Sequence, residues 1–321
     1  YTWLLNGNAL AGQSAASLTA ANAGAYRVVV TNANGCSDTS SSIVVTLQFC
    51  GFVEGHLKYL NQAATPMTHT QVTLLNQQQQ VVGQTTTNAN GSFSFSNTGN
   101  GQFSLQFSTA KPWGGVNATD ALATVRHFVG MAPLSGLGLL AADVNASNNI
   151  NTSDALLMAR RFTGDVNSFA AGDWVFEQPA VVVNNDTALV QVGALTYGDI
   201  NGSYLPDVQL RLGKAVSLRP KGYLKPEAQS WNIHTETAVE LGAISLVLTL
   251  PEGIEVHRVS VPGSTEQAQF TRHGRQLRIS WFSLQPLTLQ AGDELVQLHY
   301  TGTTTAAEAE LALEPGCEFA D

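Results

Sequence analysis

Charged residues are scarce in this 321-residue sequence, and the scarcity argues against several kinds of partner. Lysine and arginine together number 15 against 24 aspartates and glutamates, which gives a net charge of −9. No basic stripe is present to neutralise phosphates, so the composition argues against nucleic-acid binding. Nor does any run approach the roughly eighteen apolar residues that indicate a membrane-spanning helix.

Cysteine is also rare, with Cys36, Cys50 and Cys317 only. No two of them have metal-ligand spacing, and no Cys-x-x-Cys occurs. The odd count leaves two alternatives open: disulfide partners outside this stretch, or free thiols. The chain begins at Tyr1 without a signal peptide, which predicts a processed or excised piece of a longer protein.

Sequence signatures of catalysis are missing. There is no Gly-x-Ser-x-Gly, no His-Glu-x-x-His, no phosphate-binding loop and no dinucleotide-binding glycine fingerprint. Adjacent acidic residues such as Asp293 and Glu294 would face opposite sides of a strand, which is unsuited to paired acid–base chemistry. The sequence therefore predicts that the chain is not an enzyme. Four tryptophans could form a platform for sugars, although core packing is favoured: Trp113, Trp174, Trp231 and Trp281.

One twelve-residue stretch, 143–154, has the pattern of a calcium-binding loop. Oxygen-bearing side chains fall at loop positions 1, 3, 5, 9 and 12, and position 7 can offer its carbonyl. Asn148 stands where such a loop needs a positive φ, which asparagine tolerates better than most residues. A helix from Asp154 to Arg161, closed by Gly164, should follow. A metal-free turn is the alternative. The predicted ligands are Asp143, Asn145, Ser147, Asn149 through its carbonyl, Asn151 and Asp154.

The same loop-and-helix unit occurs a second time, but only in part. Residues 116–122 repeat the pattern of 150–156, whereas residues 111–115 offer no carboxylate. Residues 199–203 carry oxygens at positions 1, 3 and 5 of the same pattern and then break off. We therefore expect a second, split calcium site; an ordinary Asx turn at 199–203 is the alternative. Its first half would be Asp199, Asn201 and Ser203, and its second half Asn117 and Asp120.

The duplicated loop and helix, with aspartate rather than glutamate at position 12 and an asparagine-rich middle, resemble the dockerin family over residues 109–207. That resemblance implies calcium as cofactor and protein–protein contact as function. Because millimolar calcium occurs outside the cell, we expect an extracellular or cell-surface location.

The rest of the chain consists of short alternating runs bounded by Asn-Gly and Gly turns, which predicts β-sandwiches in series. Residues 1–49 resemble part of an immunoglobulin-like domain, with Trp3 and Tyr26 on core strands. Residues 50–108, with the turn and strand at 88–93, resemble carboxypeptidase-regulatory-like or Cna-B-like sandwiches. Residues 208–321, with a strand at 243–251 and a Trp281 strand, resemble a cohesin-like jelly roll, which we expect to be truncated.

The predicted fold is therefore mainly β: serial sandwiches with a small helical, dockerin-like EF-hand pair between them. The expected domains are 1–49, 50–108, 109–207 with an inserted β-hairpin, and 208–321. This domain order is similar to that of large surface proteins exported by type IX secretion.

The sequence predicts a noncatalytic, calcium-stabilised module for surface adhesion or filament assembly within a large multidomain protein. Its dockerin-like and cohesin-like parts would pack within one chain or join neighbouring chains, including into a homopolymer. The alternative is the accessory region, stalk or carbohydrate-binding, of a large secreted glycosidase or protease. A glycan is a further candidate ligand.

Overall fold

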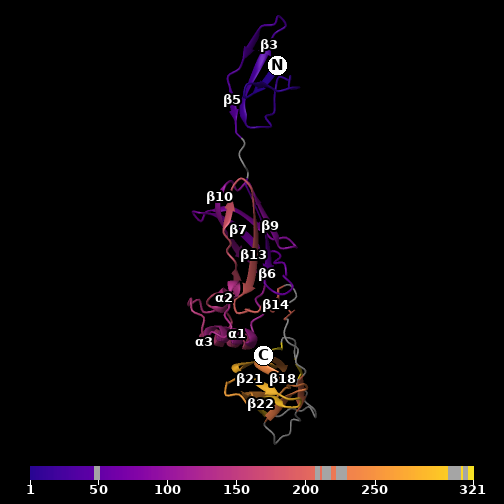
Figure 1. Cartoon of the computed structure of the whole chain (residues 1–321). Helices are drawn as coiled ribbons and strands as arrows, with labels where there is room; N and C mark the ends of the chain where they lie inside the picture. Colours follow the sequence, from indigo (N-terminus) through magenta and orange to yellow (C-terminus); the bar gives the residue numbers. More distant parts are fainter. Residues whose placement is uncertain (47–50, 207–209, 212–217, 222–229, 303–311, 314–316) are drawn as a thin grey trace.

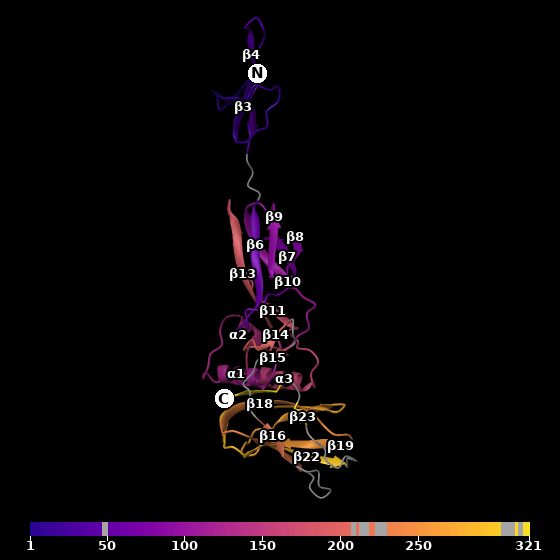
Figure 2. The same cartoon turned by 90° about the vertical axis from the view of Figure 1, so that its right-hand side faces the viewer.

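The computed structural model describes all residues except 47–50, 207–209, 212–217, 222–229, 303–311 and 314–316. The chain forms an N-terminal sheet, a central sandwich with three helices at one end, and a C-terminal sandwich beneath those helices (Figures 1 and 2). Strands far outnumber helices among the described elements. The predicted mainly β fold with one small helical module is confirmed.

The N-terminal part is one antiparallel sheet in the order β2-β1-β3-β4, with β5 also pairing with β3. Tyr26 is 6% exposed, and its hydroxyl donates to the Asn22 carbonyl at 2.9 Å, a local bond of the kind that fixes a corner in immunoglobulin-type sandwiches. Cys36 is exposed, and Cys50 lies outside the described residues. The strands are β1 (Thr2–Leu5), β2 (Asn8–Ala9), β3 (Gly24–Thr31), β4 (Ser37–Thr39) and β5 (Ile43–Val45).

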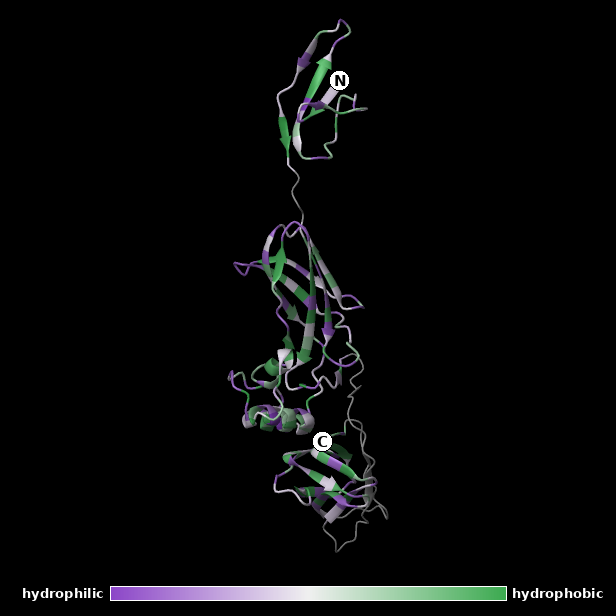
Figure 3. Cartoon of the chain, in the orientation of Figure 1, coloured by the Kyte–Doolittle hydropathy of each residue, from purple (hydrophilic) through white to green (hydrophobic). Residues whose placement is uncertain are grey.

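The central sandwich has two four-stranded sheets, β12-β10-β7-β8 and β11-β13-β6-β9. Every second residue of β6 is buried, as expected for a strand with one face on a core. Figure 3 shows the matching alternation of apolar and polar residues along the strands. The strands are β6 (Phe52–Tyr59), β7 (Gln71–Asn76), β8 (Val81–Thr86), β9 (Ser92–Ser96), β10 (Gly101–Ser108), β11 (Trp174–Phe176), β12 (Val181–Val183) and β13 (Thr187–Thr196).

Strands β11 to β13 differ from the hairpin that the sequence predicts within the 109–207 module. In the structure β12 pairs with β10, and β13 pairs in parallel with β6 while β11 lines its other edge. The reason is burial: Val190, Val192 and Leu195 are apolar residues of β13 that fill the sandwich core. Alternation in the sequence locates a strand but does not reveal its partner. The helical module is thus inserted into the sandwich.

The helical module contains α1 (Ala118–Phe128), α2 (Gly136–Ala142) and α3 (Thr152–Thr163). Helices α1 and α3 begin with the same capping box, Asn117 with Asp120 and Asn151 with Asp154. Helix α3 ends at Gly164, which has φ +89°, so the predicted closure of this helix is confirmed. The two helices pack around a small shared core that includes Ala121, Val125, Ala155 and Met158.

The C-terminal sandwich has one sheet in the order β16-β17-β22-β19 and another in the order β20-β21-β18-β23, with β24 also on β18. Trp231 and Trp281 lie in its core, 3% and 1% exposed, so neither can serve as a sugar platform. A short ladder of β14 (Tyr204–Leu205) and β15 (Leu210–Arg211) precedes it. The strands are β16 (Leu218–Lys221), β17 (Ser230–Thr235), β18 (Val239–Thr249), β19 (Ile254–Ser260), β20 (Gln269–His273), β21 (Gln276–Leu289), β22 (Glu294–Gly302), β23 (Ala312–Leu313) and β24 (Glu318–Ala320).

Helices α1 and α3 lie against the face of the β20-β21-β18 sheet (Figure 2). Ala118 N donates to Ser245 Oγ at 2.9 Å, and an Arg278 guanidinium N–H donates to the Phe162 carbonyl at 3.3 Å. Apolar side chains of β21, such as Phe282 and Leu284, pack against the helical core. The helical module is therefore held between two sandwiches.

Candidate calcium sites

The intact loop, residues 143–154, is curled around its own oxygen atoms. Asp143 follows α2 directly; its Oδ1 accepts from Ser147 N at 3.0 Å and its Oδ2 from Asn148 N at 2.7 Å. Asn145 Oδ1 also accepts from Ser147 N, at 2.9 Å. Asn148 has φ +61°, which confirms the predicted left-handed residue. The side chains at positions 1 and 3 therefore both point toward the backbone N–H of Ser147.

Asp154, at the last position, ties the end of this loop to its beginning. Its side chain is fully buried; Oδ1 accepts from Asn145 N at 3.3 Å and Oδ2 from Asn151 N at 3.0 Å. Burial raises the pKa of Asp154, and the nearby Asp143 carboxylate adds to the rise. The Asn149 carbonyl accepts from Ser147 Oγ at 3.0 Å, so this carbonyl also faces the loop interior. All six predicted residues thus belong to one closed loop.

The two segments of the expected split site meet in the structure. Asp120 Oδ1 accepts from Ile200 N at 2.8 Å and from Asn201 N at 3.2 Å, although these residues are separated by about eighty positions. Asp199 Oδ1 accepts from Ser203 N at 2.9 Å, and so does Asn201 Oδ1. The segment 199–203 therefore lies directly beside the half-loop that ends at Asp120.

The bonding of the split site repeats that of the intact loop at positions 1, 3 and 12. Asp199 and Asn201 both accept from Ser203 N, as Asp143 and Asn145 both accept from Ser147 N. The final aspartate accepts from the position-3 amide in each case, Asp120 from Asn201 and Asp154 from Asn145. Segment 199–203 thus occupies, relative to α1, the place that 143–147 occupies relative to α3.

The split site is the more buried of the two. Asp120 and Asp199 are both fully buried. Burial raises the pKa of Asp120 well above its usual range, and the charges of Asp199 and Glu318 raise it further. Burial likewise raises the pKa of Asp199. Buried carboxylates that lie close together repel one another, so binding of a cation between them is favourable.

The chemistry of the donors fits calcium at both loops. Every candidate ligand offers oxygen, from carboxylate, amide, hydroxyl or carbonyl groups, which suits a hard cation and not zinc or copper. Within the described part of the chain, no three His, Cys, Asp or Glu side chains form a metal cluster. The loops instead combine two aspartates each with neutral oxygens, as calcium loops commonly do.

Three further residues border the split site and have no place in the predicted ligand set. The Tyr59 hydroxyl donates to Asp199 Oδ2, and burial with the nearby Asp199 charge raises the pKa of Tyr59 well above its usual range. The Gly115 carbonyl accepts from Asn117 Nδ2 at 2.7 Å. The Glu318 carboxylate accepts from Asn117 Nδ2 at 2.8 Å. The glycine beside the half-loop was a usable signal, whereas Tyr59 and Glu318 come from strands remote in sequence.

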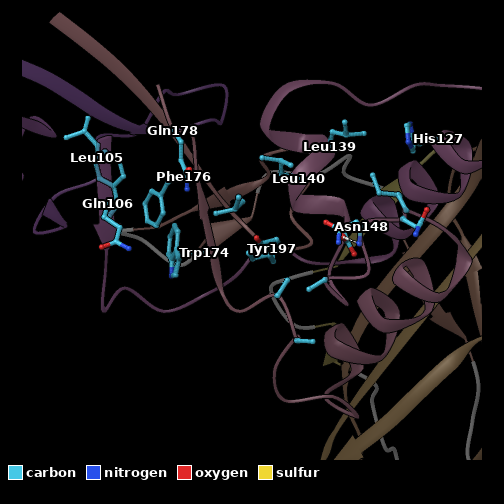
Figure 4. Close-up of a pocket in the computed structure, with 18 residues that line it drawn as sticks. Leu105, Gln106, His127, Leu139, Leu140, Asn148, Trp174, Phe176, Gln178 and Tyr197 are labelled. Carbon is cyan, nitrogen blue, oxygen red and sulfur yellow. Dashed lines mark hydrogen bonds between the residues drawn. The ribbon is translucent and has the colours of Figure 1, made fainter. Parts of the chain in front are cut away.

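A cavity of about 920 Å³ opens between the intact loop and the central sandwich (Figure 4). Phe107 and Phe176 stack at 5.3 Å, and Trp174 stacks on Phe176 at 6.3 Å. These three rings line the cavity together with Tyr197. Trp113, in contrast, lies under the Arg161 guanidinium at 3.9 Å. Of the four tryptophans considered for sugar binding, Trp174 is the one in an open aromatic row.

Comparison with known proteins identifies the helical part of the chain. Residues 114–163 match the dockerin type I domain, which confirms the dockerin resemblance for α1, the intact loop and α3. The segment 199–203 lies outside the match. No curated protein matches the chain. None of the described helices has the length and apolar character needed to cross a membrane.

Solved structures similar to the chain include bacterial pilins. The full-length major pilin SpaD from Corynebacterium diphtheriae is 13% identical over 81% of this chain and 60% of its own, with a TM-score of 0.26. BcpA, the major pilin subunit of Bacillus cereus, is 8% identical over 84% of this chain and 66% of its own, with a TM-score of 0.26. The chain thus spans about 60% of the length of SpaD.

Proposed function

We propose that this chain is a noncatalytic, calcium-stabilised assembly module of a large extracellular surface protein. One observation carries the proposal: the two loop-and-helix units share one bonding pattern, and each ends on a buried aspartate, Asp120 or Asp154, that accepts from the amide at position 3 of its loop. A loop that is closed in this way, with oxygen donors on its inner side, is suited to binding a cation.

The proposed ligands of the intact loop are Asp143, Asn145, Ser147, the Asn149 carbonyl, Asn151 and Asp154; those of the split site are Asp199, Asn201, Ser203, Asn117 and Asp120. Calcium bound there would offset the repulsion between the paired aspartates of each loop. At the split site it would also join segments that are distant in sequence. The ion is therefore assigned a structural part, and the match to the dockerin type I domain supports the assignment.

The assembly role rests on the surface that α1 and α3 present to the C-terminal sandwich. His273 Nε2 lies 3.2 Å from the Thr163 carbonyl, and Ser245 and Arg278 bond to the ends of the same helices. The dockerin-like module thus packs against the C-terminal sandwich of its own chain, for which the sequence predicts a cohesin-like fold. The same pairing between neighbouring chains would build a filament or sheath, as would strand exchange.

Calcium titration of the full chain by calorimetry tests the proposal. The unchanged chain should bind calcium at both loops, Asp154→Asn should lose the intact loop alone, and Asp120→Asn the split site alone. Asp186→Asn, in an exposed turn where the carboxylate caps Thr187 N at 2.7 Å, should bind as the unchanged chain does. Equal calcium stoichiometry in all four proteins would refute the assignment.

A second candidate function, carbohydrate binding, is favoured by the aromatic row of Phe107, Phe176 and Trp174 beside the open cavity. Stacked rings at a cavity wall suit the apolar face of a sugar. Under this alternative the chain is the accessory region of a secreted glycosidase or protease. Glycan-array binding that is lost in Phe176→Ala and kept in Phe128→Ala, an exposed ring on α1, would support it; absence of any glycan binding would end it.

A further inference from the structure

Glu318 belongs to the C-terminal sandwich yet lies at the split site. It opens β24 and pairs with Ser245 of β18, the same serine whose hydroxyl receives the Ala118 amide of α1. Its side chain is 3% exposed. Oε2 accepts from Asn117 Nδ2 at 2.8 Å, and Oε1 accepts from Asn201 Nδ2 at 3.3 Å. One carboxylate from another domain therefore bonds to both halves of the split site.

These bonds fix the orientation of two candidate ligands. A carboxylate only accepts hydrogen bonds, so it holds the NH₂ end of each amide and leaves the oxygen end for the loop. Asn201 Oδ1 faces Ser203 N at 2.9 Å, and Asn117 Oδ1 faces Thr119 N at 2.7 Å. Groups that orient metal ligands from behind typically change metal affinity by about 10–100-fold.

Glu318 also brings a third negative charge to a site that already holds two. Asp120, Asp199 and Glu318 are all buried, and Glu318 bonds to the side chain of Asn201, whose backbone N–H donates to Asp120. Burying like charges together costs free energy unless a cation is present. Docking of the C-terminal sandwich, which brings in Glu318, should therefore be more favourable when a cation occupies the split site.

Resting on the calcium sites proposed above, we propose that Glu318 is a positioning residue through which calcium binding at the split site and docking of the C-terminal sandwich reinforce each other. The coupling is reciprocal: the factor by which docking tightens calcium binding is the factor by which calcium tightens docking. The intact loop has no such outside carboxylate among the described residues. Its Asn151 Nδ2 bonds within the loop, to the Asn149 carbonyl at 3.5 Å. Calcium at the intact loop should be indifferent to docking.

Calorimetric calcium titration of the full chain tests the coupling with Glu318→Gln, which keeps the size of the side chain and removes its charge. Affinity at the split site should fall about 10–100-fold while affinity at the intact loop stays unchanged. That unchanged affinity also reports that the variant is folded. The matched control is Glu240→Gln, an exposed carboxylate on β18 of the same sandwich, which should bind calcium at both loops as the unchanged chain does.

Hydrogen exchange measures docking directly. Calcium should slow exchange in peptides covering 117–122 and 243–247 of the unchanged chain, and this protection should shrink in Glu318→Gln. Glu318→Asp keeps the charge but has a shorter side chain. Its calcium affinity at the split site should therefore lie between that of the unchanged chain and that of Glu318→Gln. Unchanged split-site affinity in Glu318→Gln would overturn the coupling and leave the calcium module intact. If Asp120→Asn binds calcium as the unchanged chain does, the split site does not exist, and the coupling is overturned with it.

Discussion

At the scale of single residues, the two candidate calcium loops are built from short local patterns that can be recognised in the sequence. Oxygen donors at alternate positions, an Asn at the left-handed position and an aspartate opening a helix can all be recognised without a fold. Asp143 to Asp154 could therefore be predicted as one unit. Tyr59 and Glu318 could not, because each reaches the split site from a strand whose partner is set by tertiary packing.

Gly115 is a residue where shape rather than charge decides whether the split site forms. Its φ is +88°, and a Cβ there would lie 2.3 Å from Asp199 Cγ, so the buried Asp199 side chain would have to move away. Gly115→Ala should displace Asp199, abolish calcium binding at the split site and cost about 1–3 kcal/mol of stability. Calorimetry should show the intact loop still binding.

The matched control for this substitution is Gly130→Ala. Gly130 has φ +78°, and nothing lies within 4 Å of the point that a Cβ would occupy, so it shares the backbone strain without the collision. The strain alone should cost roughly 1 kcal/mol. If the two variants bind calcium alike, the close approach of Gly115 to Asp199 has no role in the site.

At the scale of secondary-structure elements, the sandwich shows what the sequence leaves open. Each strand is visible as an alternating run, and the mainly β fold follows from those runs. The pairing of β13 with β6 is not visible, since more than a hundred residues separate them and the helical module intervenes. For the same reason, the sequence does not show that the end of β13 places Asp199 at the split site.

Val192, fully buried on β13, tests whether this late strand completes the core. Val192→Ala should lower the free energy of unfolding by about 1–3 kcal/mol, because the buried side chain loses its packing against the facing sheet. Leu189→Ala, on the same strand but 76% exposed, should change it by less than about 0.5 kcal/mol. Urea unfolding measures both; equal effects would mean that β13 does not lie in the core.

At the scale of the whole molecule, the split site is where three parts of the chain converge. Tyr59 comes from the central sandwich, Asp120 from the helical module and Glu318 from the C-terminal sandwich. The intact loop, in contrast, is closed by its own residues. The two proposed ions should therefore stabilise different amounts of structure. The ion at the intact loop should stabilise that loop alone, whereas the ion at the split site should hold domains together.

Calcium removal should expose this difference to a protease. With EDTA, segments 109–117 and 197–205 of the full chain should become cleavable together, since the ion that joins them would be gone, while strands β6 to β9 stay protected by their own core. Asp120→Asn in calcium should reproduce the cleavage of these two segments but leave residues 143–151 protected, whereas EDTA should expose all three. Asp154→Asn in calcium should instead expose residues 143–151 alone. Mass spectrometry of the first fragments distinguishes the patterns. If EDTA leaves both segments intact, or opens one without the other, the split site is not the clamp between them.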